Sequence, residues 1–219
     1  MATVLITGAN RGIGLELSRQ LNQRGDEVIA LCRKTSPELA ALGVRSFVGV
    51  DVTDQDALEA TSQQLGAAKI DVLINNAGIF EDEAFDDLDF ESIRHQFEVN
   101  ALGALRVTSA MRSHLKRGSK IIIITSRMGS IGDNGSGSYY GYRMSKAALN
   151  MAGVNLAHDF RSKGIAVAIL HPGLVATNMT GHEGIPVTES AQGLIARIDG
   201  LRLADSGSFW HANGEQLPW

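Results

Sequence analysis

Short apolar runs rich in β-branched residues alternate along the chain with longer stretches in which apolar positions recur every three or four residues. The short runs are continuously apolar, which is typical of strands that are covered on both faces. They predict seven strands, at residues 3–7, 27–31, 44–50, 71–75, 120–125, 165–170 and 208–212. The longer stretches predict helices near residues 11–24, 36–42, 54–66, 89–116, 139–163 and 189–201.

This regular alternation of strands and helices predicts an α/β fold. Strand–helix repeats form a doubly wound, mostly parallel sheet with right-handed crossovers and helices on both faces. The length of 219 residues, with no linker or internal repeat, predicts one domain over residues 1–219. Sheets of this type bind ligands beyond the carboxyl ends of their strands, so functional residues are expected just after the predicted strands.

Composition narrows the classes of partner. The net charge of −4 gives no general attraction to nucleic acid or to an anionic membrane. Cys32 is the one cysteine, so no internal disulfide can form and a reducing compartment is compatible. The start of the chain lacks a signal-peptide pattern, and no apolar run approaches the ~20 residues of a membrane span. A cytoplasmic location is expected, and no metal site.

A glycine-rich turn follows the first predicted strand and opens the first predicted helix. Such a turn lets backbone approach a pyrophosphate, and the helix start offers free N–H groups and a positive dipole end. An ordinary strand–helix turn would need one glycine or two. The turn therefore predicts a phosphate-binding site whose members are Gly8, Asn10, Arg11, Gly12, Ile13 and Gly14.

The residues after the second strand favour NADP(H) over NAD(H). NAD enzymes of this architecture carry an acid there for the ribose 2′-hydroxyl, but Arg33 follows this strand closely. Asp26 precedes the strand and so belongs to the wrong end of the sheet. Arg11 and Arg33 are suited to a 2′-phosphate, because guanidinium groups make planar, multidentate contacts with phosphate. The alternative is that both are solvated surface arginines.

The ends of the third and fourth strands add further candidate cofactor contacts. Asp51 and Val52 close the third strand, where the carboxylate could accept from an adenine amino group or cap the next helix. Asn76, Ala77 and Gly78 close the fourth, where small residues suit a chain that passes close beneath a cofactor. The alternative there is an ordinary turn.

Tyr142 and Lys146 form the candidate catalytic pair. They are four residues apart in a predicted helix and so share one face. A phenol with a pKa of about 10 is a poor acid–base catalyst at neutral pH, and a nearby ammonium is expected to lower that pKa. The alternative is a chance pair on a surface helix.

Ser126 and Asn100 are candidate partners of this pair. Ser126 follows the fifth strand, where its hydroxyl could hydrogen-bond a substrate oxygen as charge develops. Asn100 lies inside a predicted helix, where it could hold a water that links Lys146 to solvent. A solvent-facing or locally bonded amide is the alternative for Asn100.

The end of the sixth strand supplies a last set of candidates. The backbone at Val175 and the hydroxyl of Thr177 could contact a carboxamide, while Pro172 and Gly173 are more simply a turn. His171 is a candidate general base. Because it lies at a strand end beside a proline, a structural role is favoured.

With these residues in place, the sequence resembles the short-chain dehydrogenase/reductase family. The matching motifs follow the family's order: T-G-x-x-x-G-x-G at 7–14, N-N-A-G at 75–78, Asn100, Ser126, Y-x-x-x-K at 142–146 and P-G at 172–173. The resemblance implies a Rossmann-like, seven-stranded sheet and a catalytic tetrad formed by Asn100, Ser126, Tyr142 and Lys146. It also implies hydride transfer between a nicotinamide and a carbonyl carbon, with Tyr142 and Lys146 near the cofactor.

Within the family, residues 120–150 and the segments 207–211 and 217–219 resemble the C-factor group, which is close to small carbonyl reductases. Ser126 lies sixteen residues before Tyr142, three more than many family members have. Gly129, which stands at the usual interval, carries no hydroxyl, and Ser130 is a competitor. We prefer Ser126 because it ends the strand and Gly129 follows it at the family's S-x-x-G interval.

The predicted function is therefore NADP(H)-dependent interconversion of a carbonyl and an alcohol in a small molecule. One alternative is a reductase of carrier-bound ketoacyl chains, docked through Arg112, Lys116, Arg117 and Lys120. Another is a nucleotide-binding signalling protein of the C-factor type that does not need turnover. The resemblance also implies a homodimer or homotetramer paired through the helices at 89–116 and 139–163.

Two irregular segments flank the expected entrance. Residues 81–91 carry seven acidic side chains, which predict either a solvated loop or an entrance that disfavours anionic substrates. Residues 178–188 form a short cover, which predicts an open pocket. Candidate apolar wall residues are Ile79, Phe80, Phe85, Met128, Val175 and Met179.

Overall fold

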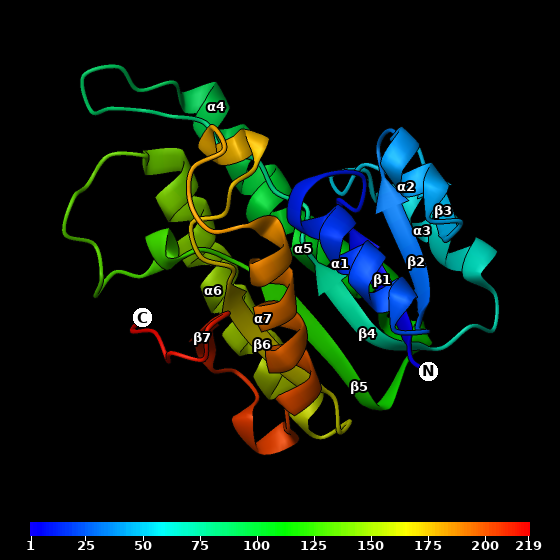
Figure 1. Ribbon diagram of the computed structural model, residues 1–219. Coiled ribbons are helices and arrows are strands. Elements are labelled where there is room, and N and C mark those ends of the chain that lie inside the picture. Colours follow the sequence, from blue (N-terminus) through cyan, green and yellow to red (C-terminus); the bar gives the residue numbers. More distant parts are fainter.

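The computed structural model describes residues 1–219 and contains one parallel, seven-stranded sheet (Figure 1). Its strands are β1 (Thr3–Thr7), β2 (Glu27–Cys32), β3 (Arg45–Val48), β4 (Ile70–Asn75), β5 (Leu115–Ile124), β6 (Ala166–His171) and β7 (Phe209–His211). Their order is β3-β2-β1-β4-β5-β6-β7, and every neighbouring pair is parallel. The order reverses between β1 and β4, which places the expected binding crevice at their carboxyl ends. The predicted fold class is confirmed.

The helices follow the predicted ranges with one interruption. They are α1 (Gly12–Gln23), α2 (Pro37–Ala41), α3 (Gln55–Leu65), α4 (Phe90–Phe97), α5 (Gly103–Met111), α6 (Tyr140–Arg161) and α7 (Val187–Gly200). The single helix predicted at 89–116 is wrong, because a π-helical turn at Glu98–Leu102 separates α4 from α5 and β5 begins at Leu115. No helix has the length and apolar character needed to span a bilayer.

Helices cover both faces of the sheet, as Figure 1 shows. On one face, α1 and α7 pack against the central strands through side chains such as Leu17 and Leu194, both fully buried. On the other face, α3 and α5 cover one half, and α6 covers the half formed by β5, β6 and β7. The continuously apolar strands are explained by this double coverage, because neither of their faces meets water.

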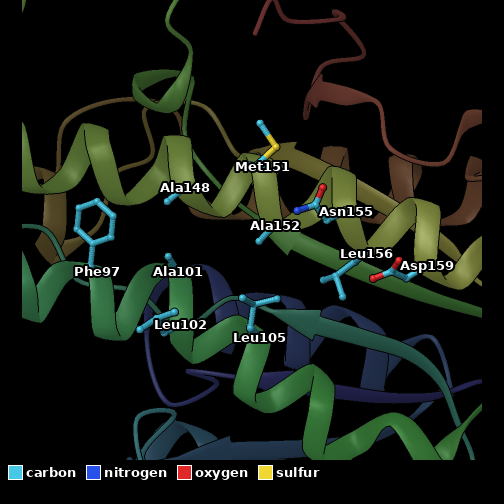
Figure 2. Close-up of a pocket in the computed structure, with 10 residues that line it drawn as sticks. All are labelled: Phe97, Ala101, Leu102, Leu105, Ala148, Met151, Ala152, Asn155, Leu156 and Asp159. Carbon is cyan, nitrogen blue, oxygen red and sulfur yellow. The ribbon is translucent and has the colours of Figure 1, made fainter.

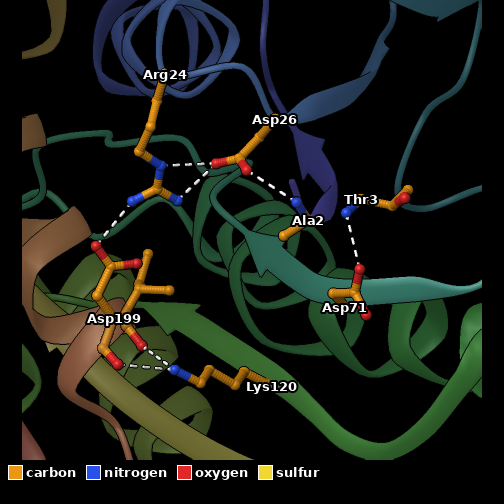
Figure 3. A network of polar contacts seen from close by, with 8 residues as sticks. Ala2, Thr3, Arg24, Asp26, Asp71, Lys120 and Asp199 are labelled. Carbon is orange, nitrogen blue, oxygen red and sulfur yellow. Dashed lines mark hydrogen bonds and ion pairs between the residues drawn. The ribbon is translucent and has the colours of Figure 1, made fainter.

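The amino-terminal edge of the sheet is held by ion pairs and hydrogen bonds (Figure 3). Arg24 pairs with Asp26 at 2.6 Å and with Asp199 at 2.7 Å, and Asp26 accepts from the backbone N–H of Ala2. Lys120 donates to the backbone oxygen of Asp199 at 3.0 Å. Asp26 therefore lies at the end of the sheet away from the binding crevice, as expected from its place before β2.

The predicted carrier-docking residues also lie at this amino-terminal edge. Arg112 begins the 3₁₀ turn that precedes β5, Lys116 and Arg117 lie near the start of β5, and Lys120 lies at its middle. Lys116 is paired with Asp71 at 2.9 Å. These side chains therefore lie at the edge of the sheet opposite the binding crevice, because in a parallel sheet the starts and the ends of the strands lie on opposite edges. Docking of a carrier through them stays a prediction.

Gly153 sets how closely α6 approaches the sheet. A Cβ atom at this position would lie 2.6 Å from Cγ1 of Ile169 on β6. We expect Gly153→Ala to lower the free energy of unfolding by about 1–3 kcal/mol, since an overpacked core must shift to relieve the clash. Gly200→Ala is the matched control, because a Cβ there meets nothing within 4 Å. Urea unfolding measures both, and equal stability of the two variants would contradict the tight contact.

Candidate active site

The glycine-rich turn brings backbone segments into close contact at the end of β1. Gly8 and Gly12 have φ angles of +65° and +53°, a region that side-chain-bearing residues rarely adopt. A Cβ on Gly14 would collide with the carbonyl oxygen of Gly8 and the side-chain amide of Asn76. All three glycines are therefore required by this geometry, which an ordinary turn would not demand.

Asn76 and Thr7 fasten the ends of β1 and β4 together. The Asn76 side-chain amide donates to the carbonyl oxygens of Thr7 at 3.0 Å and Gly8 at 3.3 Å. The Thr7 hydroxyl oxygen accepts from the backbone N–H groups of Asn76 and Ala77, both at 3.0 Å. The Asn76 amide thus shapes the crevice by holding the glycine turn in place.

Arg11 and Arg33 both lie exposed at this edge, where their charges are available to a ligand. Arg33 approaches Asp51 with an N–O distance of 3.7 Å. Burial opposes ionisation of Asp51, but hydrogen bonds from Thr53 and the Arg33 charge outweigh it and lower the pKa of the Asp51 carboxyl. The suggestion that Asp51 caps the next helix is wrong, because Asp54 performs that role by accepting from Ala57 N–H.

Tyr142 and Lys146 lie together inside the protein, on the first two turns of α6. Their exposed fractions are 8% and 4%. The Lys146 Nζ lies 5.6 Å from the centre of the Tyr142 ring and donates to the Ile124 carbonyl oxygen at 3.2 Å. The alternative of a chance pair on a surface helix is therefore wrong.

Ser126 is the serine that meets the tyrosine. It is buried and near enough to Tyr142 to oppose the rise in the pKa of the phenol, and its Oγ accepts from the Met128 backbone N–H at 3.1 Å. The competing Ser130 is buried and uses its hydroxyl oxygen to accept from the Asp133 N–H at 3.1 Å. Position 129 requires glycine for a steric reason, because a Cβ on Gly129 would lie 2.7 Å from the Lys146 carbonyl carbon.

Burial dominates the ionisation of this pair. It raises the pKa of Tyr142 to about 12, although the hydrogen bond with Ser126 opposes the shift. It also lowers the pKa of Lys146 to about 8. The expectation that the ammonium makes the phenol more acidic is wrong for the protein alone, because desolvation of the phenolate is the larger effect.

Asn100 sits in the π-helical turn and is fully buried. Its Oδ1 accepts from the Ile79 N–H at 2.8 Å, and its Nδ2 donates to the Ile79 carbonyl at 3.0 Å and to the Ser145 hydroxyl at 3.0 Å. The solvent-facing alternative is therefore wrong. A Cβ on Gly78 would lie 3.2 Å from Asn100 Oδ1 and 3.5 Å from Lys146 Nζ, so both polar atoms border the same small space.

The segment after β6 reaches back over the glycine turn. A Cβ on Gly12 would lie 3.5 Å from the Thr177 side chain, which also caps the short 3₁₀ turn Asn178–Thr180. Gly173 has a φ of +91°, and the carbonyl of Pro172 accepts from the Ser190 hydroxyl at 2.8 Å. These contacts place residues 172–177 across the crevice from β1.

Aromatic side chains border the tyrosine. Phe80 contacts Tyr142 edge to face at a centroid distance of 5.0 Å, and it also meets Tyr139 at 5.5 Å. Val175, expected in the pocket wall, is 3% exposed and belongs to the packed interior. Phe85 is 72% exposed and lies outside the packed interior. No cluster of three or more side chains of the metal-ligating types is present.

Tyr139, Ser145 and Glu83 were not predicted as site residues. Tyr139 precedes the catalytic helix, and Ser145 bonds the Asn100 amide from the other side. Glu83 is buried within the acidic segment, at 3% exposure. Of these three residues, only Tyr139 could have been suggested by the local sequence, because it lies in a run of tyrosines at the start of the predicted helix. The other two depend on contacts with distant segments.

The family model described as short chain dehydrogenase matches residues 2–185. This match covers most of the chain, and the fold and the placement of the motifs agree with it. The protein therefore belongs to the short-chain dehydrogenase family of oxidoreductases.

Similar proteins include a 1-hydroxy-2-glutathionyl-2-methyl-3-butene dehydrogenase from Rhodococcus sp. strain AD45, which is 45% identical over the full length of both chains. The C-signal protein of Myxococcus xanthus is 42% identical over its full length and 74% of this chain. Among solved structures, the NADPH-bound carbonyl reductase from chicken fatty liver is 30% identical, with a TM-score of 0.91 over 100% of this chain and 99% of that one.

The lowered pKa of His171 predicts how the stability of the protein depends on pH. Burial, followed by the charges of His211, Arg127 and Lys146, lowers the pKa of His171 to about 3 from its ordinary 6.5. A lowered folded-state pKa means that the unfolded chain binds the proton more tightly. The stability contributed by neutral His171 is therefore complete above pH 6.5 and is lost as pH falls toward 3.

Between pH 6.5 and 5 we expect the wild type to lose about 2 kcal/mol more unfolding free energy than His171→Asn. Urea unfolding at each pH measures the difference. The exposed His182→Asn serves as control and should follow the wild-type pH dependence. An identical acid profile for all three proteins would show that His171 is not held neutral by the fold.

Proposed function

We propose that this protein is an NADP(H)-dependent oxidoreductase that interconverts a carbonyl and an alcohol, with Tyr142 as the general acid and base. The observation that carries the proposal is the joint burial of Tyr142, Ser126 and Lys146, with the Lys146 Nζ 5.6 Å from the centre of the Tyr142 ring. Ser126 follows the end of β5, and Lys146 Nζ borders Gly78 after the end of β4, so the group lies at the carboxyl edge of the sheet. Burial of a phenol and an amine together needs compensation, which a substrate oxygen and a cofactor would supply.

The residues of the crevice fit a dinucleotide phosphate. The glycine turn leaves no side chain between its backbone and a pyrophosphate, and α1 begins there with its free N–H groups. Arg11 and Arg33 would hold the 2′-phosphate, while Asp51 and Val52 would contact the adenine. Asn76, Ala77 and Gly78 would line the floor. Residues 172–177 and Lys146 would lie against the nicotinamide end, and the bound nicotinamide supplies the hydride in reduction.

The chain's own groups orient the substrate and move the proton. Ser126 and Tyr142 hydrogen-bond the carbonyl oxygen, and the Tyr142 hydroxyl donates its proton to it. A raised pKa keeps this donor protonated at neutral pH, which favours the reduction direction. Lys146 stabilises the phenolate that results. Asn100 Oδ1 borders the same space as the Lys146 ammonium and so provides one place for a water that returns the proton.

A second candidate substrate class is an alcohol that carries a bulky thioether group. The relative from Rhodococcus, similar over its whole length, is named for oxidation of a glutathionyl alkenol. A large substrate would be compatible with the short 178–188 segment, in which Met179 is exposed, and with the exposed Leu174 before it. NADPH with aldehydes, ketones and diketones, and NADP⁺ with glutathione-conjugated alcohols, form the panel that separates the two classes.

A purely signalling role is less well supported. A protein that only binds a nucleotide has no need to bury a lysine whose pKa falls to about 8 beside a phenol. Loss of biological effect in a catalytically inactive variant would favour turnover as the function.

Tyr142→Phe tests the mechanism directly. The ring and its contact with Phe80 are kept, and only the hydroxyl is lost. We expect kcat/KM to fall about 10²–10⁴-fold, the usual contribution of a general acid, while the Kd for NADPH changes little. Tyr140→Phe is the control and should retain wild-type activity. Equal loss of NADPH binding and turnover would show that the change acts on folding.

Arg33→Ser tests the choice of cofactor. Removing a charged hydrogen bond to phosphate costs about 1.5–3 kcal/mol, so KM for NADPH should rise about 10-fold or more. KM for NADH, which has no 2′-phosphate, should stay nearly constant. Lys34→Ser, at the exposed neighbouring position, is the control. Parallel changes with both cofactors would contradict the assignment of Arg33.

We also propose that two copies pair through the groove between α5 and α6. Figure 2 shows this apolar groove, of about 430 Å³, running between the two helices. Its lining includes Leu105 and Met151, which are 36% and 62% exposed. A homodimer or homotetramer would remove these large apolar side chains from water.

A further inference from the structure

Glu83 differs from the other acids of the 81–91 segment. It is 3% exposed, whereas Glu81, Asp82, Asp86 and Asp87 are exposed to solvent. The interpretation of the segment as a solvated loop is therefore wrong for this one residue. Burial of a carboxylate is costly unless its oxygens are hydrogen-bonded, so the contacts of Glu83 indicate what keeps it there.

Three donors from two helices surround the Glu83 carboxylate. Its Oε1 accepts from the Ser92 hydroxyl at 2.7 Å and from the Gln96 side-chain amide at 2.5 Å, both on α4. Its Oε2 accepts from the backbone N–H of Gly141 at 3.1 Å, on α6. None of these partners is positively charged, so Glu83 joins two helices through hydrogen bonds alone.

The contact with Gly141 supplies a cap that the catalytic helix otherwise lacks. The residue before α6 is Tyr139, whose side chain makes no capping hydrogen bond. Ser138 and Tyr139 both have φ near +55°, a strained region for these residues, and the Tyr139 N–H donates to the Glu83 carbonyl at 2.9 Å. A carboxylate at a helix start also meets the positive end of the helix dipole.

Tyr142 is the next residue after Gly141, so the cap acts one position from the proposed proton donor. The packing leaves no room for adjustment there. A Cβ on Gly141 would lie 2.5 Å from the Gln96 amide nitrogen and 2.9 Å from Glu83 Oε1. Phe80, three residues before Glu83, contacts the Tyr142 ring itself. Phe80 therefore borders the Tyr142 ring, and Glu83 anchors the helix turn that carries Tyr142.

We propose that Glu83 is a positioning residue, which holds the first turn of α6 so that the Tyr142 hydroxyl faces Ser126. This inference rests on the proposed function of Tyr142. Glu83 acts through the Gly141 backbone and Gln96, without contacting substrate or cofactor itself.

Glu83→Gln keeps the volume of the side chain but replaces one acceptor oxygen with an N–H₂ donor that opposes the existing donors. We expect kcat to fall about 10- to 100-fold, since small misplacements of a catalytic group have effects of this size. The Kd for NADPH should stay within about two-fold, because most of the proposed cofactor contacts lie at the ends of β1, β2, β3, β4 and β6, away from the first turn of α6. Glu81→Gln, the same change at an exposed position, should leave kcat unaltered.

A rescue experiment separates positioning from simple loss of stability. Gln96→Glu alone places two carboxylates together and should also lower kcat. The Glu83→Gln, Gln96→Glu double variant restores one donor and one acceptor between positions 83 and 96. It should recover a large part of kcat at 25 °C, and thermal unfolding confirms that each variant is folded at that temperature.

Hydrogen–deuterium exchange of residues 138–144 measures how firmly Glu83 holds the start of α6, and this measurement does not depend on turnover. Faster exchange in Glu83→Gln, but not in Glu81→Gln, together with the loss of kcat would support the proposal. Wild-type kcat in Glu83→Gln would overturn it while leaving the proposed function intact. Absence of turnover by the wild type across the whole substrate panel would instead defeat the proposed function, and the positioning role with it.

Discussion

Parallel alignment of all seven strands is the constraint on which the rest of the structure depends. It brings the ends of β1, β4, β5 and β6 to one edge, although the residues that follow them are far apart in the sequence. The Thr7 and Asn76 hydrogen bonds close the gap between β1 and β4 at that edge. These hydrogen bonds hold the glycine turn against the end of β4.

Burial determines the chemical character of the site more than its charges do. The phenol of Tyr142 is harder to ionise and the amine of Lys146 easier to neutralise than either group in water. Without a ligand, the phenol of Tyr142 therefore stays protonated at neutral pH. Under the proposed function, this is the form that would donate its proton to a substrate oxygen.

The tightly packed centre of the site differs from the exposed segments around it in how much change its packing tolerates. The glycine turn and the Tyr142 helix are held by close backbone contacts, which tolerate little change. The segments at 81–91 and 178–188 are mostly exposed, although Glu83 within the first is buried. Proteins similar to this chain are named for a glutathionyl alkenol and for carbonyl reduction, so the fold alone does not fix the substrate.

The amino-acid sequence by itself determined the order of strands and helices, the glycine turn and the residue types at each strand end. These features depend on local periodicity and on backbone geometry, both of which are readable from neighbouring residues. The tertiary structure alone decided that Glu83 is buried, that Asn100 sits in a π-helical turn bonded to Ile79, and that the basic residues of β5 face the far edge. It also reversed the expected direction of the pKa of Tyr142. The physical reason is that burial and long-range hydrogen bonds arise only when distant segments pack together.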